Sequence, residues 1–224
     1  MKMIFNDWQL IDYQTAWDKQ KHIFNSLIDK KINPDLDIKD ITPQVILCEH
    51  PHVYTLGRNG KASNLLANEA FLQKINATFY HIDRGGDITY HGPGQLVGYP
   101  ILDIAAMHLS LKDYVYCLEE SIIQTIAYYG IKGSRLQGAT GVWLDIDKAN
   151  VRKICAIGIR ASHYITMHGF ALNVNTDLNY FHYINPCGFV DKGVTSIESE
   201  LQRKIDMHEV KQIYKQSFTN VFKQ

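Results

Sequence analysis

The chain has 224 residues, 46% of them hydrophobic, which is enough apolar material for one substantial core, so we expect a single domain over residues 1–224. Basic and acidic residues are equal at 23 each, which excludes an overall field that would attract nucleic acid, an anionic membrane or a highly charged partner. The N-terminus lacks the features of a secretory or transit signal, no run is long enough to span a membrane, and the four cysteines are widely spaced. We therefore expect a protein of the reducing cytoplasm.

The N-terminal quarter predicts a helix, a loop and a buried strand. Apolar residues recur at helical spacing over residues 13–28, which predicts an amphipathic helix packed on a core. Residues 30–43 are polar and contain two prolines, which is typical of a loop, and residues 44–48 are a buried strand candidate. The turn that follows carries His50 and His52. Two histidines without a visible cluster of further ligands are a weak metal motif, so we expect no metal site.

The next segment ends in an unusual glycine-rich stretch. Residues 68–76 predict a short helix and residues 78–83 a strand. Residues 84–100 then read RGGDITYHGPGQLVGYP, and their five glycines and two prolines predict a structured loop that enters or leaves a strand. The loop lacks both glycine motifs for phosphate binding, while the polar groups of Arg84, Asp87 and His91 can converge on a ligand.

The C-terminal half predicts two capped helices around a meander. Ser110 opens a capping-box pattern and the longest helix, for which Gly130 is the natural stop. Three strand patterns follow and predict an antiparallel meander, at residues 142–147, 152–160 and 168–174. A second capping box, DMHE, opens a final helix at Asp206. Strands and helices mix without strict βαβ alternation, which indicates an α+β fold.

One cysteine differs from the others in its sequence context. Cys48, Cys117 and Cys155 lie in apolar strand or helix patterns, where a free cysteine is commonly a small core residue. Cys187 instead lies between proline and glycine, which predicts a turn from which its thiol can project into a cleft as a nucleophile. Lys153 lies in an apolar strand pattern, and from the residues alone it reads as a solvated charge at a strand edge.

Several motifs follow one another in an order that identifies a family. Besides the glycine-rich stretch, they are EHPHVYTLGR (49–58), GVW (141–143), KICAIGIR (153–160), THGFALNVN with Met167 inserted after Thr166, PCG (186–188) and VTSIE (194–198). Together they resemble the signature of the lipoyl(octanoyl) transferases, the octanoyltransferases of protein lipoylation, over most of residues 45–200. The resemblance implies the catalytic-domain fold of the biotin and lipoate protein ligases, a mixed sheet flanked by helices.

The resemblance also assigns roles to residues. It implies that Cys187 is the acyl-thioester nucleophile and that Lys153 completes a Cys/Lys dyad, in which the ammonium favours the thiolate. The residues that match the family's substrate-binding segments are Arg84, Gly85, Gly86, Asp87, Ile88, Thr89, Tyr90, His91, Ala156, Ile157, Gly158, Gly169, Phe170 and Ala171. Their glycines and apolar side chains suit an acyl chain. Cys155 departs from the family's usual alanine, and two-residue spacing from Lys153 predicts a second thiol near the dyad.

The function implied is transfer of octanoyl from octanoyl-acyl carrier protein to a specific lysine of lipoyl domains, the first step of endogenous protein lipoylation. The acceptors implied are the lipoyl domains of dehydrogenase E2 subunits and the glycine cleavage H protein. Because a thioester donor is already activated, we expect no nucleotide, metal or other cofactor, and we expect a monomer. Two alternatives are an ATP-dependent lipoate or biotin ligase of the same fold and a non-catalytic acyl-binding module.

Overall fold

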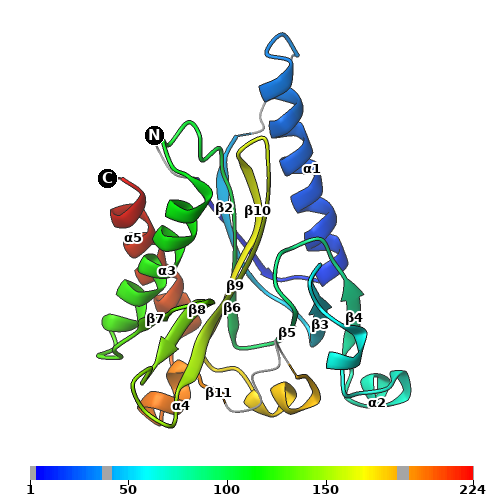
Figure 1. Ribbon diagram of the computed structural model, residues 1–224, viewed down its shortest axis with the longest axis vertical. Helices are drawn as coiled ribbons and strands as arrows, with labels where there is room; N and C mark the ends of the chain where they lie inside the picture. The colour runs from blue at the N-terminus through cyan, green and yellow to red at the C-terminus, as the bar shows by residue number, and fades with distance from the viewer. Residues whose placement is uncertain (1–3, 37–41, 186–191, 224) are drawn as a thin grey trace.

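Two β-sheets form the centre of the computed structural model, which describes residues 4–36, 42–185 and 192–223 (Figure 1). The large sheet has the strand order β1-β2-β6-β10-β9-β8-β7, with β11 paired to β9, and the small sheet has the order β4-β3-β5. The strands of the large sheet are β1 (Ile4–Leu10), β2 (Gln44–Glu49), β6 (Gln95–Ile101), β7 (Ser134–Leu136), β8 (Ala139–Leu144), β9 (Arg152–Ser162), β10 (Ile165–Asn173) and β11 (Gly193–Val194). Those of the small sheet are β3 (Val53–Leu56), β4 (Thr78–His81) and β5 (Ile88–His91).

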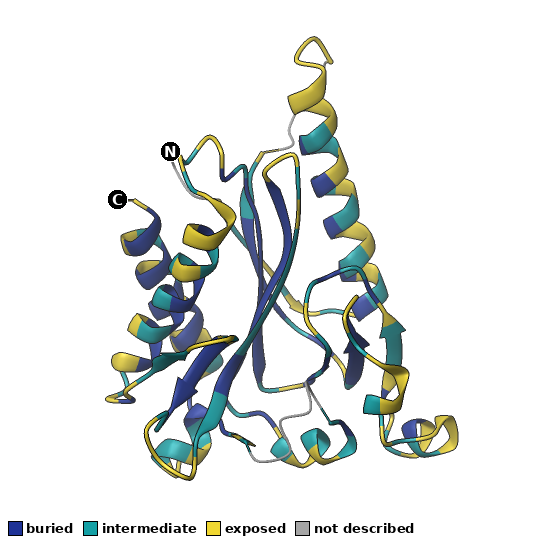
Figure 2. Ribbon diagram, in the orientation of Figure 1, coloured by how far each residue is buried: buried dark blue, intermediate teal, exposed yellow. Residues whose placement is uncertain are grey.

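Helices cover both faces of the large sheet, as Figure 1 shows. On one face α3 (Leu111–Ala127) and α5 (Met207–Phe222) enclose the larger hydrophobic core, and on the other α1 (Tyr13–Ile32) packs on β6 and β10. The central strands are buried, whereas the outer faces of the helices and the end of α1 are exposed (Figure 2). The short helices are η1 (Ala62–Asn64), α2 (Glu69–Lys74), η2 (Leu178–Tyr183) and α4 (Ile197–Leu201). The expected fold, a mixed sheet flanked by helices, is confirmed.

The two long C-terminal helices begin where the sequence predicted, but by different caps. At α3 the hydroxyl of Ser110 accepts a hydrogen bond from the Asp113 N–H, and the Asp113 carboxylate accepts one from the Ser110 N–H, which confirms the capping box. At α5 the Asp206 carboxylate accepts from the His208 N–H at 2.9 Å, so an aspartate cap replaces the second predicted box. Gly130 takes a positive φ of 76° in the turn after α3.

The glycine-rich stretch contains more regular structure than predicted. Its residues form β5 and most of β6, which belong to different sheets, and only the short turn between them crosses from one sheet to the other. Pro100 is tolerated inside β6 because the registered pairing with β10 runs only as far as Gly98, and the Thr166 hydroxyl donates to the Pro100 carbonyl at 2.8 Å. Gly98 is required by packing, since a Cβ there would lie 1.9 Å from the Phe170 ring.

The predicted antiparallel meander is confirmed as β8, β9 and β10, although β8 and β10 each begin three residues earlier than expected. The sequence did not predict β1, which pairs in parallel with β2, or the small sheet as a separate unit. Among the described residues, no helix combines the length and apolarity needed to cross a bilayer.

Candidate active site

A cavity of about 500 Å³ lies where β9 and β10 of the large sheet meet β5 and the loop before it. Lys153 lines it, as do nearly all the predicted substrate-binding residues, which are Arg84, Gly85, Gly86, Asp87, Ile88, Thr89, His91, Ala156, Ile157, Gly158, Gly169, Phe170 and Ala171. Tyr90 is the exception. Its hydroxyl bonds with His52 Nδ1 at 2.7 Å and its ring stacks on Tyr180, outside the cavity lining. Cys187 lies outside the described residues.

Strand register explains why segments far apart in the sequence meet here. Ala156 pairs with Ala171, and Gly158 with Gly169, across β9 and β10. The glycine-rich loop is attached to the same strand, because the Gly85 N–H donates to the Ile159 carbonyl at 2.8 Å. The cavity is therefore bounded by backbone from three chain segments.

The cavity glycines serve close approach of backbone to backbone. A Cβ at Gly158 would lie 2.9 Å from the Gly85 carbonyl oxygen, and one at Gly169 would lie 2.2 Å from that of Gly98. A larger residue at either position would therefore displace a neighbouring strand or loop before it reached a ligand. The alanines on the same strands are better placed to act on the cavity volume alone.

Lys153 and Cys155 lie in different environments although two residues separate them. Trp143 pairs with Lys153 and Val142 with Cys155, so β9 carries one extra residue between them and the alternation of faces is broken. Lys153 lines the cavity with its Nζ 4.5 Å from the centre of the Trp143 ring. Cys155 is fully buried in the larger core, and burial raises the pKa of its thiol. The predicted second thiol near Lys153 is thus a core residue.

The other two described cysteines differ from each other. Cys48 is fully buried, and desolvation raises the pKa of its thiol. Cys117 is only half-buried on α3, so its prediction as a packed residue is only partly correct. Burial raises the pKa of this thiol as well.

One wall of the cavity carries a buried histidine, His168, whose hydrogen-bond partner is Asp83, and this pair was not predicted from the sequence. His168 lines the cavity, is 2% exposed, and its Nε2 lies 2.8 Å from a carboxylate oxygen of Asp83. Asp83 also forms an ion pair with Arg160. Burial would raise the pKa of Asp83, but the His168 hydrogen bond and the Arg160 charge lower it to about 2. His168 has a positive φ of 61°, a local bend that strand periodicity cannot signal.

The N-terminal helix completes this wall. Tyr13, the first residue of α1, lines the cavity and stacks on His91 with ring centres 5.9 Å apart. Burial lowers the pKa of His91 to about 3, assisted by the nearby His50 and Arg84, so its imidazole is neutral at physiological pH. His91 is thus a neutral part of the cavity wall.

The two histidines considered as metal ligands have other partners. His50 Nδ1 lies 2.7 Å from the Ile11 carbonyl and its Nε2 lies 2.7 Å from the Tyr99 hydroxyl. Since a carbonyl can only accept, Nδ1 carries the proton and Nε2 accepts from Tyr99. Within residues 4–36, 42–185 and 192–223, three or more His, Cys, Asp or Glu side chains nowhere form a group that could hold a metal ion.

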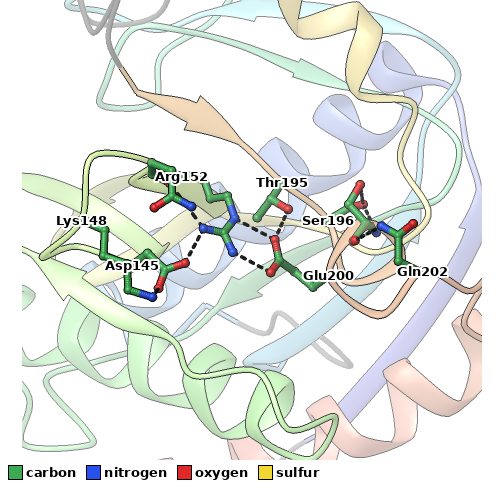
Figure 3. Close-up of polar contacts among 9 residues, drawn as sticks. Asp145, Lys148, Arg152, Thr195, Ser196, Glu200 and Gln202 are labelled. Carbon is green, nitrogen blue, oxygen red and sulfur yellow. Dashed lines mark hydrogen bonds and ion pairs between the residues drawn. The ribbon is translucent and has the colours of Figure 1, made fainter.

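A group of ion pairs and hydrogen bonds lies next to Lys153. We call it the clamp; it consists of Asp145, Arg152, Thr195 and Glu200. Figure 3 shows the Arg152 guanidinium between Asp145 and Glu200. Both Glu200 oxygens lie within 2.8 Å of its nitrogens. The hydroxyl of Thr195 donates to the same Glu200 carboxylate, and the Thr195 N–H donates to the Lys153 carbonyl at 2.9 Å. The clamp therefore ties β9 to α4, and to Thr195 just before it, next to Lys153.

Comparison with known proteins identifies the family. A family model described as the Lipoyl protein ligase A/B catalytic domain matches residues 12–219. The chain belongs to this family. One curated relative, named Octanoyltransferase, from Bacteroides fragilis (strain YCH46), is 59% identical over 212 residues, which cover 95% of this chain and 94% of the relative. Another Octanoyltransferase, from Cytophaga hutchinsonii, is 51% identical over 225 residues, covering 98% and 92% of the two chains. The resemblance found in the sequence is confirmed, and it places this lipoyl protein ligase A/B family member among the acyltransferases.

Solved structures agree on the fold. A bipartite lipoate protein ligase from Thermoplasma acidophilum superposes with a TM-score of 0.66 at 14% identity, covering 99% of this chain and 85% of that one. Biotin protein ligase from Aquifex aeolicus superposes with a TM-score of 0.51 at 11% identity, covering 99% and 69%. At such low identity the structural similarity establishes the fold of this family member. Its chemistry has to be inferred from the residues of the site.

Proposed function

We propose that this chain transfers an octanoyl group from octanoyl-acyl carrier protein to a specific lysine of lipoyl domains through a thioester at Cys187. One observation carries the proposal: Lys153 lines the same cavity as the segments that are expected to hold the acyl chain. Lys153 is the lysine expected in the dyad, and those segments form a partly apolar wall made largely of backbone. High identity to proteins named Octanoyltransferase supports the same acyl group. The acceptors we propose are lipoyl domains of E2 subunits and the H protein, with the enzyme acting as a cytoplasmic monomer.

In the first step the Cys187 thiolate attacks the thioester carbonyl of the carrier-bound octanoyl group. A new C–S bond forms to Cys187, the C–S bond to phosphopantetheine breaks, and the leaving thiolate takes a proton from the Lys153 ammonium. The products are an octanoyl thioester on Cys187, a free carrier thiol and a neutral Lys153.

In the second step the neutral amine of the target lysine attacks the Cys187 thioester. A C–N bond forms, the C–S bond to Cys187 breaks, and Lys153 accepts the proton that the amine loses. The enzyme returns to a thiolate beside an ammonium, and the acceptor carries a stable octanoyl amide. No bond to phosphate forms in either step, so the cycle needs no nucleotide.

Intact mass spectrometry after mixing with octanoyl-acyl carrier protein tests this proposal. We expect an octanoyl adduct on the wild-type chain that disappears when apo lipoyl domain is added. Cys187→Ala should form no adduct, whereas Cys117→Ala, which removes a half-buried thiol on α3, should form it normally. Persistence of the adduct in Cys187→Ala would show that another residue is the nucleophile.

Two other functions predict different outcomes in the same assay. An ATP-dependent ligase would modify the lipoyl domain with free octanoate and ATP and would not need the carrier thioester. A non-catalytic acyl-binding module would hold octanoyl-acyl carrier protein without forming a covalent adduct. Either result would replace the transferase proposal.

A further inference from the structure

A chain of hydrogen bonds runs along the cavity wall, in which every donor points the same way. We call it the donor chain; it consists of Arg84, Thr55, His91, Gln95, Asn173, Thr195 and the carbonyl of Lys153. Of these residues, Arg84, His91, Gln95, Asn173 and Lys153 all line the cavity. Gln95 Nε2 donates to Asn173 Oδ1 at 2.9 Å, and Asn173 Nδ2 donates to the Thr195 carbonyl at 2.9 Å. The Thr195 N–H then donates to the Lys153 carbonyl at 2.9 Å. The donor chain thus connects β6, β10 and β9.

Two backbone carbonyls determine the direction of these bonds. A carbonyl can only accept, so the Asn173 atom that faces the Thr195 carbonyl is its amide nitrogen, and Oδ1 faces Gln95. Gln95 Nε2 also donates to the Tyr90 carbonyl at 3.1 Å, which fixes the Gln95 amide independently. Gln95 Oε1 must therefore face His91, from which it lies 2.9 Å.

This orientation fixes the tautomer of His91. Because Gln95 Oε1 is an acceptor, His91 Nδ1 carries the proton and Nε2 holds the lone pair. The Thr55 hydroxyl lies 3.4 Å from that Nε2 and accepts from Arg84 Nη2 at 2.9 Å, so its own proton is available to His91. Arg84 is thereby joined, through Thr55 and His91, to the other end of the donor chain at the Lys153 carbonyl.

The donor chain is buried, and its ends lie on different parts of the cavity. Thr55 is 0%, Gln95 1%, Thr195 3% and Asn173 4% exposed. Its ends are the guanidinium of Arg84, in the glycine-rich loop, and the carbonyl of Lys153, on β9. In the donor chain each donor has an acceptor. This favours one arrangement of the groups that it joins, because a flipped amide would place two acceptors against each other.

We propose that Gln95 and Asn173 are positioning residues, which hold Lys153 and the Arg84–His91 wall in one geometry across the cavity. The inference rests on the proposed function, which supplies the reaction that these residues support. Neither side chain takes part in a chemical step. Gln95 belongs to β6 of the large sheet, and its side chain joins that sheet to His91 on β5 of the small sheet. Loss of its amide would remove this connection between the two sheets at the cavity.

The first test is independent of catalysis. Long-range ¹⁵N–¹H NMR of the wild-type chain with labelled histidine should show His91 as the neutral Nδ1–H tautomer. In Gln95→Met, which removes donor and acceptor at similar side-chain size, this signal should shift or broaden between tautomers. An Nε2–H tautomer or an imidazolium in the wild-type chain at neutral pH would overturn the donor chain, whether or not the chain transfers octanoyl.

The second test measures acylation of Cys187 from octanoyl-acyl carrier protein in single turnovers. Gln95→Met should lower the maximal rate by about 100-fold, as expected for a displaced reacting geometry, with little change in half-saturation. The Gln95→Glu side chain still has an oxygen that can accept from His91. It can donate to Asn173 only when its carboxyl group is protonated. The rate of this variant relative to wild type should therefore fall as pH rises, a dependence that Gln95→Met lacks.

Controls separate positioning from folding. Gln216→Glu makes the same amide-to-acid change on the exposed face of α5 and should follow the wild-type pH profile. Near-ultraviolet circular dichroism identifies any variant that has lost its tertiary structure, in which case the wild-type NMR result alone decides. Equal rates with the same pH profile in Gln95→Met, Gln95→Glu and wild type would refute the positioning role. Absence of any adduct in the wild-type chain would instead refute the proposed function.

Discussion

The environment of Lys153 bears on whether one side chain can serve both half-reactions. An ammonium beside a thiolate is stabilised by the opposite charge, and acylation of the cysteine removes that charge. In the proposed cycle the neutral Lys153 amine then accepts a proton from the attacking lysine. The ring of Trp143, 4.5 Å from Nζ, holds the charged group over an apolar surface.

Lys153→Arg tests this exchange of protons. Arginine keeps the positive charge but cannot release a proton near neutral pH, so acylation of Cys187 should be partly retained while transfer to the lipoyl domain fails more severely. Single-turnover rates of the two half-reactions provide the measurement. Lys148→Arg, in the exposed ion pair with Asp145, is the matched control. Equal losses in both half-reactions, or normal transfer, would refute the proton role.

Ala156 is the residue at which the acyl cavity can be narrowed with least effect on the fold. It lines the cavity opposite Ala171, and its methyl group already occupies the direction a larger side chain would take. Ala156→Val should therefore shift preference in Cys187 acylation from octanoyl toward hexanoyl, measured by competition between the two acyl carriers. Ala161→Val, exposed on the same strand, should leave the preference unchanged. Unaltered selectivity in Ala156→Val would mean that the acyl chain lies elsewhere.

At the scale of elements, the clamp in Figure 3 offers a comparison between two cations that share one carboxylate. Arg152 is partly buried and joins Asp145 to Glu200, whereas Lys148 is largely exposed and pairs with Asp145. Arg152→Ala should lower the free energy of unfolding by roughly 1–3 kcal/mol, because two carboxylates lose a charged donor. Lys148→Ala should change it by about 0–0.5 kcal/mol. Urea denaturation measures both, and equal effects would show that the clamp contributes nothing beyond a surface ion pair.

Elements specified by neighbouring residues were predictable, and those specified by distant ones were not. The cap at Ser110 depends on a residue three positions away, so the sequence alone located the start of α3. For the stretch that contains β6 the sequence predicts a structured loop that enters or leaves a strand, because its glycines and prolines are unfavourable locally. Contacts of Gly98 with Phe170, and of Pro100 with Thr166, outweigh that preference and involve residues more than sixty positions away.

The candidate site divides in the same way. The motifs located most of the cavity lining, because each short segment contributes several neighbouring residues to it. The pair of His168, which lines the cavity, and its partner Asp83 was not predicted, since the two residues are 85 positions apart and neither stands out in a periodic pattern. The broken alternation between Lys153 and Cys155 also depends on pairing with β8, which the β9 sequence does not contain.

For the whole molecule, buried neutral histidines predict a particular loss of stability in acid. His50 is fully buried, and desolvation lowers its pKa from 6.5 to about 4. For His91 the same cause lowers the pKa to about 3. Between these values and 6.5 the unfolded chain binds protons that the folded chain excludes, so the stability present above pH 6.5 is lost as pH falls toward the folded pKa values.

The expected slope is about 1.4 kcal/mol per pH unit for each histidine within this window, at most. Urea denaturation at intervals from neutral pH down to about pH 4 should show the decline. His50→Gln should lower stability at neutral pH, since the bonds to Ile11 and Tyr99 are disturbed, but it should also flatten the slope by about one histidine's share. His22→Gln removes an exposed imidazole from α1 and serves as the control. A slope in His50→Gln as steep as in the wild-type chain would show that His50 is not kept neutral by the fold, and that the acid sensitivity arises from other groups.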